Sequence, residues 1–593
     1  MLKDLKSIVV LAAIALAFQL SGYVWGNRDG SFKLQDPDCY MRLVRVQEFE
    51  KNGDWYDSRI PRSNAPHGET LHWTRPFDVL LLAGAKMLQP FFGFDRALLF
   101  WGIIVSPFLQ FISALALVWA AGILFTDIQE RLRLTILFLL QPAAFIPFIA
   151  GRPDHHSLLI LFFIIEVGFL VRLLTEPTQR RAWILGALLA FSMWISVESL
   201  MVVAFCLSVL LLNWISREEN SLAPIATTSM SLFLFSVLFL AMDKPQFLLV
   251  EYDRLSLVYI FAFSIHTLFW LALLSLERRH VLASSRWARA LLTAIGGLIV
   301  LGVVADAFSH FIRGPYAQVN PRAIAVWLKG VKEVRPLFLW GHEPFYRVMI
   351  WLGPIFICLP FLIRRLLNTP RFTFRWHFWI FSSAGLSIFG ILSFYQIRWV
   401  YYAMIILLIP FTYILNFSIS KLPSWRFPFF ALARAGLIML FAAGFLVAGV
   451  LMMLSEKQES KKPSGSSTKI CQYLQKKFAT TQRIAAFIDI GPEILYRTPH
   501  EVIGTPYHRN GDGILFINDL MTAPTDDIAF AFIRQRSVNL ILIDTASTYA
   551  ALYQKDNTFC RRLVQNQPPP WLISLPLPDV LSSNFRLLKV VAE

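Results

Sequence analysis

The feature that most constrains this chain is a series of long apolar runs separated by short polar or basic segments. Each run approaches the roughly 20 residues that an α-helix needs to cross the hydrocarbon core of a bilayer. Only helices and closed barrels satisfy every backbone group in lipid, and runs of this length favour helices. The thirteen predicted spans are residues 8–20, 98–125, 132–150, 157–174, 182–197, 198–215, 223–241, 255–276, 288–306, 345–363, 376–394, 397–417 and 430–454. The sequence therefore predicts a polytopic α-helical membrane protein.

The amino-acid composition agrees with a membrane protein and argues against a nucleic-acid-binding protein. Of the 593 residues, 56% are hydrophobic and 16% are charged, far from the balance of a soluble domain. A net charge of +16 would suit a nucleic-acid-binding protein. The lysines and arginines, however, gather in short loops between apolar runs, where the positive-inside rule places them in the cytoplasm. We therefore expect no nucleic acid partner, and an integral protein of a bacterial inner membrane in contact with membrane lipid.

The order of spans and basic loops predicts which polar segments share a side. The N-terminal run, preceded by Lys3 and Lys6, is interpreted as an uncleaved first transmembrane helix. The apolar piece Phe77–Phe92 is interrupted by Lys86, Gln89 and Pro90, so we interpret it as an interfacial or re-entrant helix that does not cross. With that choice, the polar loops 27–97 and 307–344 and the C-terminal segment all lie on the extracytoplasmic, periplasmic side.

Two domains are predicted. Residues 1–455 form the membrane domain, and residues 456–593 form a small extracytoplasmic α/β domain that begins with a Ser/Lys-rich linker, Glu456–Lys469. In the second domain, β-like and helix-like runs alternate. The β-like runs are Ile484–Ile490, Val538–Asp544 and Phe585–Val591, and the helix-like runs are Cys471–Thr481 and Asp526–Gln535. Cys471 and Cys560 both fall in this domain, and a disulfide between them is left open.

The segment Gly151–His156 carries the first candidate site. It separates two predicted spans, and ionisable residues at a membrane boundary are costly unless they have a task. Asp154 and His156 offer a carboxylate and an imidazole two residues apart, which are suitable ligands for a divalent cation. The alternative is a solvated turn whose histidines cap the next helix.

Three further residues on the same side extend this site. Arg398 lies near the external end of the span 397–417, where a guanidinium needs an anionic partner such as phosphate, or else extends to the membrane interface. Asp36 and Glu333, taken singly, are ordinary loop carboxylates. Taken together with Asp154 and His156, they favour a metal-assisted transfer reaction with a phosphate leaving group.

Several short motifs, in order along the chain, resemble those of a known family. They are Asp36-Pro37-Asp38-Cys39-Tyr40-Met41-Arg42, Pro66-His67-Gly68, His72-Trp73-Thr74-Arg75-Pro76, Asp154-His155-His156, Val331-Lys332-Glu333-Val334-Arg335-Pro336 and Gln396-Ile397-Arg398-Trp399-Val400-Tyr401-Tyr402. The set resembles the catalytic subunit of oligosaccharyltransferase, and the single-subunit archaeal branch most closely. The resemblance implies a GT-C fold of about thirteen helices followed by a soluble external domain.

The resemblance also implies roles for individual residues. Asp36, Asp154 and His156 would ligate Mn²⁺ or Mg²⁺, with Asp36 and Glu333 at the catalytic centre and Glu333 next to the acceptor nucleophile. Arg398 would hold the diphosphate of a polyprenyl-linked glycan. Further candidates are Asp38, Arg42, His155, Tyr402, Asp489 and His508.

One family motif is missing. The acceptor-reading Trp-Trp-Asp-Tyr-Gly has no intact counterpart, and the nearest run, Ala486–Gly491, keeps only Asp489 and Gly491. We therefore expect peptides with Asn-x-Ser/Thr sequons to be poor acceptors. The polar run His500–Asn510 is the candidate for binding another acceptor, and its alternative is an ordinary surface loop.

The sequence thus predicts a glycosyltransferase that moves a sugar or oligosaccharide from a polyprenyl-(di)phosphate donor to an extracytoplasmic protein, glycan or lipid. One alternative is an enzyme that uses a polyprenyl-monophosphate-linked sugar. Another is a transporter or flippase of lipid-linked glycans, but the polar residues gather in external loops and not on broken helices at mid-membrane. A purely structural scaffold would leave the two long polar loops unexplained.

Overall fold

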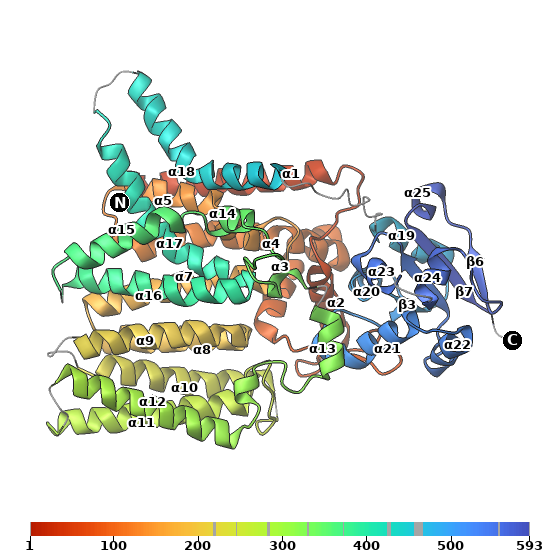
Figure 1. Ribbon diagram of the computed structural model, residues 1–593, viewed down its shortest axis with the longest axis horizontal. Helices are drawn as coiled ribbons and strands as arrows, with labels where there is room; N and C mark the ends of the chain where they lie inside the picture. The colour runs from red at the N-terminus through yellow and green to blue at the C-terminus, as the bar shows by residue number, and fades with distance from the viewer. Residues whose placement is uncertain are drawn as a thin grey trace.

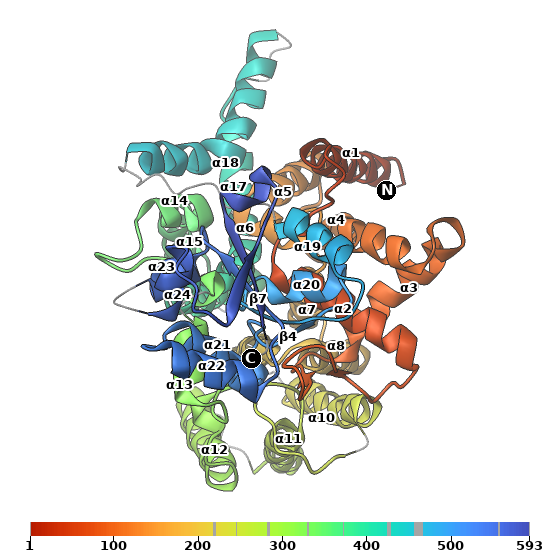
Figure 2. The ribbon, with the colours of Figure 1, turned by 90° about the vertical axis from the view of Figure 1, so that its right-hand side faces the viewer.

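The computed structural model describes residues 2–216, 221–244, 246–281, 285–328, 331–371, 373–423, 428–455, 467–554 and 558–591. Long helices form a bundle along the longest axis of the molecule, and a small α/β unit lies at one end of it (Figure 1). Viewed from that end, the α/β unit lies in front of the helices (Figure 2). The predicted linker falls largely outside the described residues, so the division at residue 455 stays a prediction.

Ten helical stretches of the described chain are long and apolar enough to cross a membrane. Their helices are α1 (Leu2–Gly26), α4 (Phe94–Ala120), α7 (His155–Thr175), α9 (Leu200–Ser216), α10 (Ala223–Asp243), α11 (Leu257–Arg278), α12 (Arg286–Ala307), α16 (Phe374–Tyr395), α17 (Val400–Ser420) and α18 (Pro428–Ser455). Two bent pairs and the 17-residue α8 (Gln179–Ile195) account for the other three predicted spans. The chain is a polytopic α-helical integral membrane protein, as predicted.

Proline explains both bent pairs. Helix α5 (Ile128–Leu140) meets α6 (Pro142–Phe145) and the 3₁₀ turn η2 (Ile146–Phe148) at 80°, and α14 (Tyr346–Leu352) meets α15 (Ile355–Asn368) at 60°. Pro142 and Pro354 lie at the two breaks. A proline has no N–H to donate and clashes with the preceding turn, so an apolar run divides there into two helices.

The first polar loop contains two long helices, of which only the second was predicted from the sequence. Helix α2 (Pro37–Asn52) begins at Asp36, whose carboxylate accepts from the Cys39 N–H at 3.1 Å, and ends at Gly53 with φ 66°. A short hairpin follows, β1 (Arg59–Ile60) with β2 (Glu69–Thr70). Helix α3 (Arg75–Phe92) lies along α4 and is not among the helices apolar enough to cross. Its predicted interfacial location stays a prediction.

The C-terminal unit is a five-stranded sheet with helices on both faces. The strand order is β4-β3-β5-β7-β6, with β4, β3 and β5 parallel and β7 and β6 antiparallel. The strands are β3 (Arg483–Ala486), β4 (Glu501–Val502), β5 (Leu540–Asp544), β6 (Leu572–Leu575) and β7 (Phe585–Val590). The helices are α19 (Ser467–Lys477), α20 (Gly491–Arg497), α21 (Gly511–Met521), α22 (Asp526–Gln535), α23 (Thr548–Tyr553), α24 (Phe559–Val564) and α25 (Asp579–Ser582). The predicted α/β class is confirmed.

The first polar loop completes the core of this unit. Alternate residues of β3 and β5 point to opposite faces. Ala485 and Ile541 belong to the apolar cluster under α21 and α24, whereas Ile484 and Leu540 belong to a second cluster that also contains residues of α2, β1 and Trp73. Backbone hydrogen bonds join the two parts, because Val502 donates to Arg62 and accepts from Ala65 at 2.9 and 3.1 Å.

The two cysteines of the C-terminal unit are not paired. Cys471 lies on α19 and Cys560 on α24, and both are buried free thiols in different apolar clusters on opposite faces of the sheet. The disulfide that the sequence left open is therefore absent from the structure. Each thiol packs as a small apolar side chain.

Candidate functional site

The candidate residues lie where helices begin or break. Asp36 precedes α2, and Asp154 precedes α7. Glu333 lies in the 3₁₀ turn η5 (Lys332–Val334), which follows α13 (Pro321–Leu328), and Arg398 lies in η6 (Ile397–Trp399) between α16 and α17. One further acid, Glu198, lies in η3 (Val197–Ser199) between α8 and α9. Side chains at such breaks leave the helix surface and can meet at one end of the bundle.

A buried arginine joins three of the predicted acids. The Arg152 guanidinium donates to Glu333 Oε1 and, at 3.3 Å, to Asp154 Oδ2, while its Nε lies 3.5 Å from Asp36 Oδ2. Only 6% of the Arg152 side chain is exposed. Segments almost 300 residues apart in the sequence therefore converge on one cation. The sequence reading included Arg152 in the motif around Asp154 but gave it no role.

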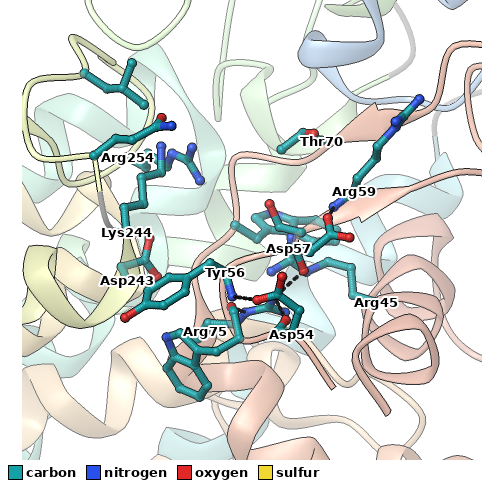
Figure 3. A pocket seen from close by; sticks show the side chains of 15 residues that line it. Arg45, Asp54, Tyr56, Asp57, Arg59, Thr70, Arg75, Asp243, Lys244 and Arg254 are labelled. Carbon is teal, nitrogen blue, oxygen red and sulfur yellow. Dashed lines mark hydrogen bonds between the residues drawn. The ribbon is translucent and has the colours of Figure 1, made fainter. Parts of the chain in front are cut away.

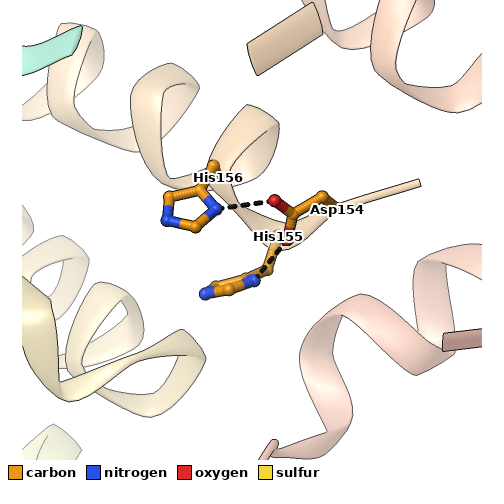
Figure 4. Close-up of side chains that lie close together, drawn as sticks. All are labelled: Asp154, His155 and His156. Carbon is orange, nitrogen blue, oxygen red and sulfur yellow. Dashed lines mark hydrogen bonds and ion pairs between the residues drawn. The ribbon is translucent and has the colours of Figure 1, made fainter. Parts of the chain in front are cut away.

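Asp154 also orients both histidines of its motif (Figure 4). Its Oδ1 lies 2.7 Å from His155 Nδ1 and its Oδ2 lies 2.7 Å from His156 Nδ1. One ligand atom from each of the three buried residues lies within 4.8 Å of the others, an arrangement that can hold a metal ion. The alternative of a solvated turn does not describe this segment, because all three side chains are buried.

Glu198 connects the histidine to the arginine predicted to bind phosphate. Its Oε2 lies 3.6 Å from both His156 Nε2 and Arg398 Nη1, and its Oε1 accepts from the Tyr402 hydroxyl at 2.8 Å. Arg398 is thus paired with a carboxylate and does not simply extend to the interface. Sequence reasoning missed Glu198, although a lone acid at the junction of two apolar runs was a usable signal.

The other candidates surround this cluster, with one exception. Burial and the nearby Asp38 carboxylate raise the pKa of the Tyr507 hydroxyl well above its usual range. The Arg42 guanidinium lies 3.9 Å from the centre of the Trp73 ring, and His508 Nε2 lies 2.7 Å from Asp253 Oδ2. His508 also packs against the rings of three residues near the cluster: His72, Tyr316 and Trp327. The run His500–Asn510 therefore reaches this region through Tyr507 and His508 and is not an ordinary surface loop.

Asp489 is the exception. Its Oδ2 accepts from Ser547 at 3.3 Å, and burial together with the nearby Asp544 raises its pKa to about 6. Both neighbours belong to the C-terminal unit. The structure therefore does not bring Asp489 together with the cluster around Arg152, and its candidate role in acceptor binding gains no support from the geometry.

The carboxyl groups of the cluster differ in their electrostatics. Burial raises the pKa of Asp36, although Arg152 opposes it, and burial with the neighbouring Asp36 raises the pKa of Asp38 well above its usual range. Burial also acts to raise the pKa of Asp154, but His156 and His155 outweigh it and hold that pKa well below the usual range. Asp154 is thus the fixed anion of the site.

Comparisons with known proteins place this geometry in context. No family model matches the sequence. The chain is 30% identical over 204 residues to the dolichyl-phosphooligosaccharide-protein glycotransferase 1 of Archaeoglobus fulgidus, an alignment that covers 32% of this chain and 33% of that protein. The matched segment therefore spans about a third of the length of the curated relative.

Solved structures match over nearly the whole chain. The archaeal oligosaccharyltransferase AglB from Archaeoglobus fulgidus, in complex with an inhibitory peptide and a dolichol-phosphate, has a TM-score of 0.72 at 13% identity, over 92% of this chain and 70% of that one. The same oligosaccharyltransferase in complex with Zn and sulfate has a TM-score of 0.65 at 12% identity, over 92% and 69%. The chain therefore has the fold of the archaeal oligosaccharyltransferase, as the resemblance of its motifs implied.

Proposed function

We propose that this protein is an integral-membrane glycosyltransferase. It transfers a sugar or oligosaccharide from a polyprenyl-(di)phosphate donor to an extracytoplasmic acceptor. The observation that carries the proposal is the convergence of Asp36, Asp154 and Glu333 on Arg152, with Glu198 connecting His156 to Arg398. Similarity to a dolichyl-phosphooligosaccharide-protein glycotransferase supports the reaction class.

The residues present fit a divalent cation. Asp154 and His156, with Asp36 beside them, would hold Mn²⁺ or Mg²⁺, and mixed carboxylate and imidazole ligands favour Mn²⁺ of the two. The buried His156 Nε2 makes no hydrogen bond among the described residues and lies 3.6 Å from Glu198 Oε2, so a carboxylate holds the imidazole beside the cluster without a hydrogen bond. When bound, the cation would supply positive charge that stabilises a departing phosphate. The related oligosaccharyltransferase has been solved with Zn and sulfate.

The chain's own side chains then account for the rest of the reaction. As the acceptor attacks the anomeric carbon, the bond from sugar to phosphate oxygen breaks and negative charge develops on the phosphate. Arg398 is positioned to bind that phosphate, exchanging its contact with Glu198 for the donor. Glu333, with 32% of its side chain exposed, is the carboxylate available to accept a hydrogen bond from the acceptor nucleophile.

The acceptor is proposed to be something other than an asparagine sequon. The related structure tethered to an acceptor peptide contains the NVT sequon, but this chain lacks the two tryptophans of the acceptor motif. A site built around the +2 hydroxyl rejects analogues that lack it, and an apolar site does not. Tyr507 and His508, next to the cluster, are the proposed acceptor-side residues.

The test uses purified protein with polyprenyl donors that differ only in carrying one or two phosphates. Panels of sequon peptides, glycans and lipids serve as acceptors, and products are read by mass spectrometry. We expect Arg398→Lys to raise the donor KM at least tenfold, because a lysine cannot bond phosphate with a planar fork. The exposed Arg313→Lys is the matched control and should leave KM unchanged.

Two results would count against the proposal. If neither donor supports transfer to any of the acceptor classes, the glycosyltransferase function is contradicted. Efficient modification of asparagine, lost when the +2 threonine becomes alanine, would restore sequon recognition and overturn only the choice of acceptor.

A further inference from the structure

A cavity of about 380 Å³, separate from the Arg152 cluster, lies between the first polar loop and the loop that follows α10 (Figure 3). It shares no lining residue with that cluster. Its volume falls in the range of about 300–1,000 Å³ that is typical of small-ligand sites. We propose that this cavity binds an acidic saccharide unit, a sugar that carries a carboxylate, belonging to a glycan substrate. The inference rests on the proposed function.

Charge is the first argument. Five cationic side chains line the cavity: Arg45, Arg59, Arg75, Lys244 and Arg254. Its three lining carboxylates, Asp54, Asp57 and Asp243, are each engaged by the protein. Asp54 and Asp57 accept from the backbone N–H groups of Tyr56 and Arg59 at 2.9 Å, and Asp243 accepts from the Trp194 indole at 3.0 Å. Four of the cations share two further acids, because Arg45 and Arg75 both pair with Asp78, and Lys244 and Arg254 both pair with Glu251. Since each of these acids is divided between two cations, the lining favours an additional anionic ligand.

Arg45 supplies the second argument. It is 3% exposed, and its Nε and Nη2 donate to Asp78 at 3.1 and 2.6 Å. Arg42 and Arg75 also pair with Asp78, so one carboxylate serves three guanidinium groups. The buried Nη1 of Arg45 has no hydrogen-bond partner among the described residues. This nitrogen is closed off from solvent, so it contributes positive charge behind this wall of the cavity.

Aromatic rings favour a saccharide over a small inorganic anion. Trp55, Tyr56 and Trp73 line the same cavity, and Tyr56 is 52% exposed. Such rings offer flat apolar faces with polar edges, which suit the C–H face and the hydroxyl groups of a sugar. An inorganic phosphate would use the cations and leave the rings uncovered.

The location connects this cavity to the reaction. Trp73 lines the cavity, and its ring also packs 5.1 Å from that of Tyr507, which lies close enough to Asp38 and Asp36 for their charges to act on its hydroxyl. Trp73 and Tyr507 therefore lie between a sugar unit in the cavity and the acids of the Arg152 cluster. The glycan of the donor or of the acceptor extends away from the reacting bond, and either one could place an acidic unit in the cavity.

Binding is measured apart from transfer. The purified full-length protein in detergent is titrated by calorimetry with a free glucuronic-acid disaccharide and with its neutral glucose counterpart. We expect the acidic disaccharide to bind at least tenfold more tightly. Tyr56→Ala and Lys244→Gln should each weaken it about fivefold or more, whereas Tyr56→Phe keeps the ring and the affinity. Trp340→Ala, an exposed aromatic outside the cavity, is the matched control.

Equal binding of the two disaccharides, or variants that bind as wild type does, would overturn the inference. A protein that transfers no sugar but still prefers the acidic disaccharide would overturn the proposed function alone. To assign the source, steady-state kinetics compare Lys244→Gln with wild type on acidic and neutral donors, and then on acidic and neutral acceptors. A KM rise confined to the acidic donor or to the acidic acceptor identifies the glycan that occupies the cavity.

Discussion

Replacing Arg152 by glutamine should destabilise the metal-free protein and increase its affinity for Mn²⁺. The substitution keeps a polar side chain of similar reach but removes the one cation that joins Asp36, Asp154 and Glu333. Three carboxylates then face one another, with Asp154 buried and Asp36 and Glu333 each about one-third exposed. Like charges at such distances repel, and a divalent cation is the natural replacement for the lost guanidinium.

The magnitude follows from the geometry. Arg152 lies 3.3 Å from Asp154 and 3.5 Å from Asp36. At those separations and an effective dielectric constant of about 20, each contact contributes roughly 5 kcal/mol of Coulomb energy, partly offset by desolvation. Removing one partner of such a buried pair typically costs about 3–5 kcal/mol. Even a third of this, recovered when Mn²⁺ binds, tightens the metal about tenfold.

The assay is a thermal unfolding series in detergent, with and without Mn²⁺, on wild type and Arg152→Gln. The variant should unfold at a lower temperature in chelator, and Mn²⁺ should raise its midpoint more than it raises that of wild type. The exposed Arg313→Gln serves as control. An identical Mn²⁺ response in wild type and variant would refute the idea that Arg152 and the metal neutralise the same carboxylates.

Two further predictions concern Glu69 and Glu198. Burial raises the pKa of Glu69 to about 7 from an ordinary 4.5, where it accepts from Ser63 and from Thr505 of the C-terminal unit. The folded state therefore binds more protons between these values, so stability falls by about 3 kcal/mol as pH rises from 4.5 to 7. Glu69→Gln should remove most of the pH dependence of the unfolding midpoint between pH 5 and 8. A midpoint that changes with pH as steeply as in wild type would contradict this. Glu198→Gln should weaken Mn²⁺ binding about 10–100-fold, because it releases His156, and Glu198→Asp should recover part of the loss. Metal titration measures both affinities, and wild-type affinity in Glu198→Gln would exclude a positioning role.

The membrane helices were predictable because their signal is local. A run of about 20 apolar residues has few alternatives in lipid, and all thirteen predicted spans correspond to helices or bent pairs. The bends were not foreseen, although Pro142 and Pro354 mark them. Helix α2 was missed because its charged residues interrupt any apolar run, even though its middle is buried. Asp36, Pro37 and Gly53 are nevertheless the start and stop signals of a helix.

Parts of the site depend on contacts that sequence spacing does not contain. The predicted topology puts Asp36, Asp154 and Glu333 on one side, but the contacts of Arg152 that join them have no signature in the sequence. The partners of Glu198 lie about 40 and 200 residues away. The shared core of the first loop and the C-terminal sheet likewise pairs segments more than 400 residues apart, and the two-residue strand β4 is too short for a periodic signal.

The most direct test of the account is the metal dependence of transfer in a single turnover. Purified protein, freed of metal by chelator, is mixed with a polyprenyl-diphosphate-linked radiolabelled saccharide and the best acceptor, with and without Mn²⁺. The account predicts product only when Mn²⁺ is present, and none with Asp154→Asn at any Mn²⁺ concentration. Equal product in chelator, or full activity of Asp154→Asn, would contradict the claim that this cluster is a metal-assisted transfer centre.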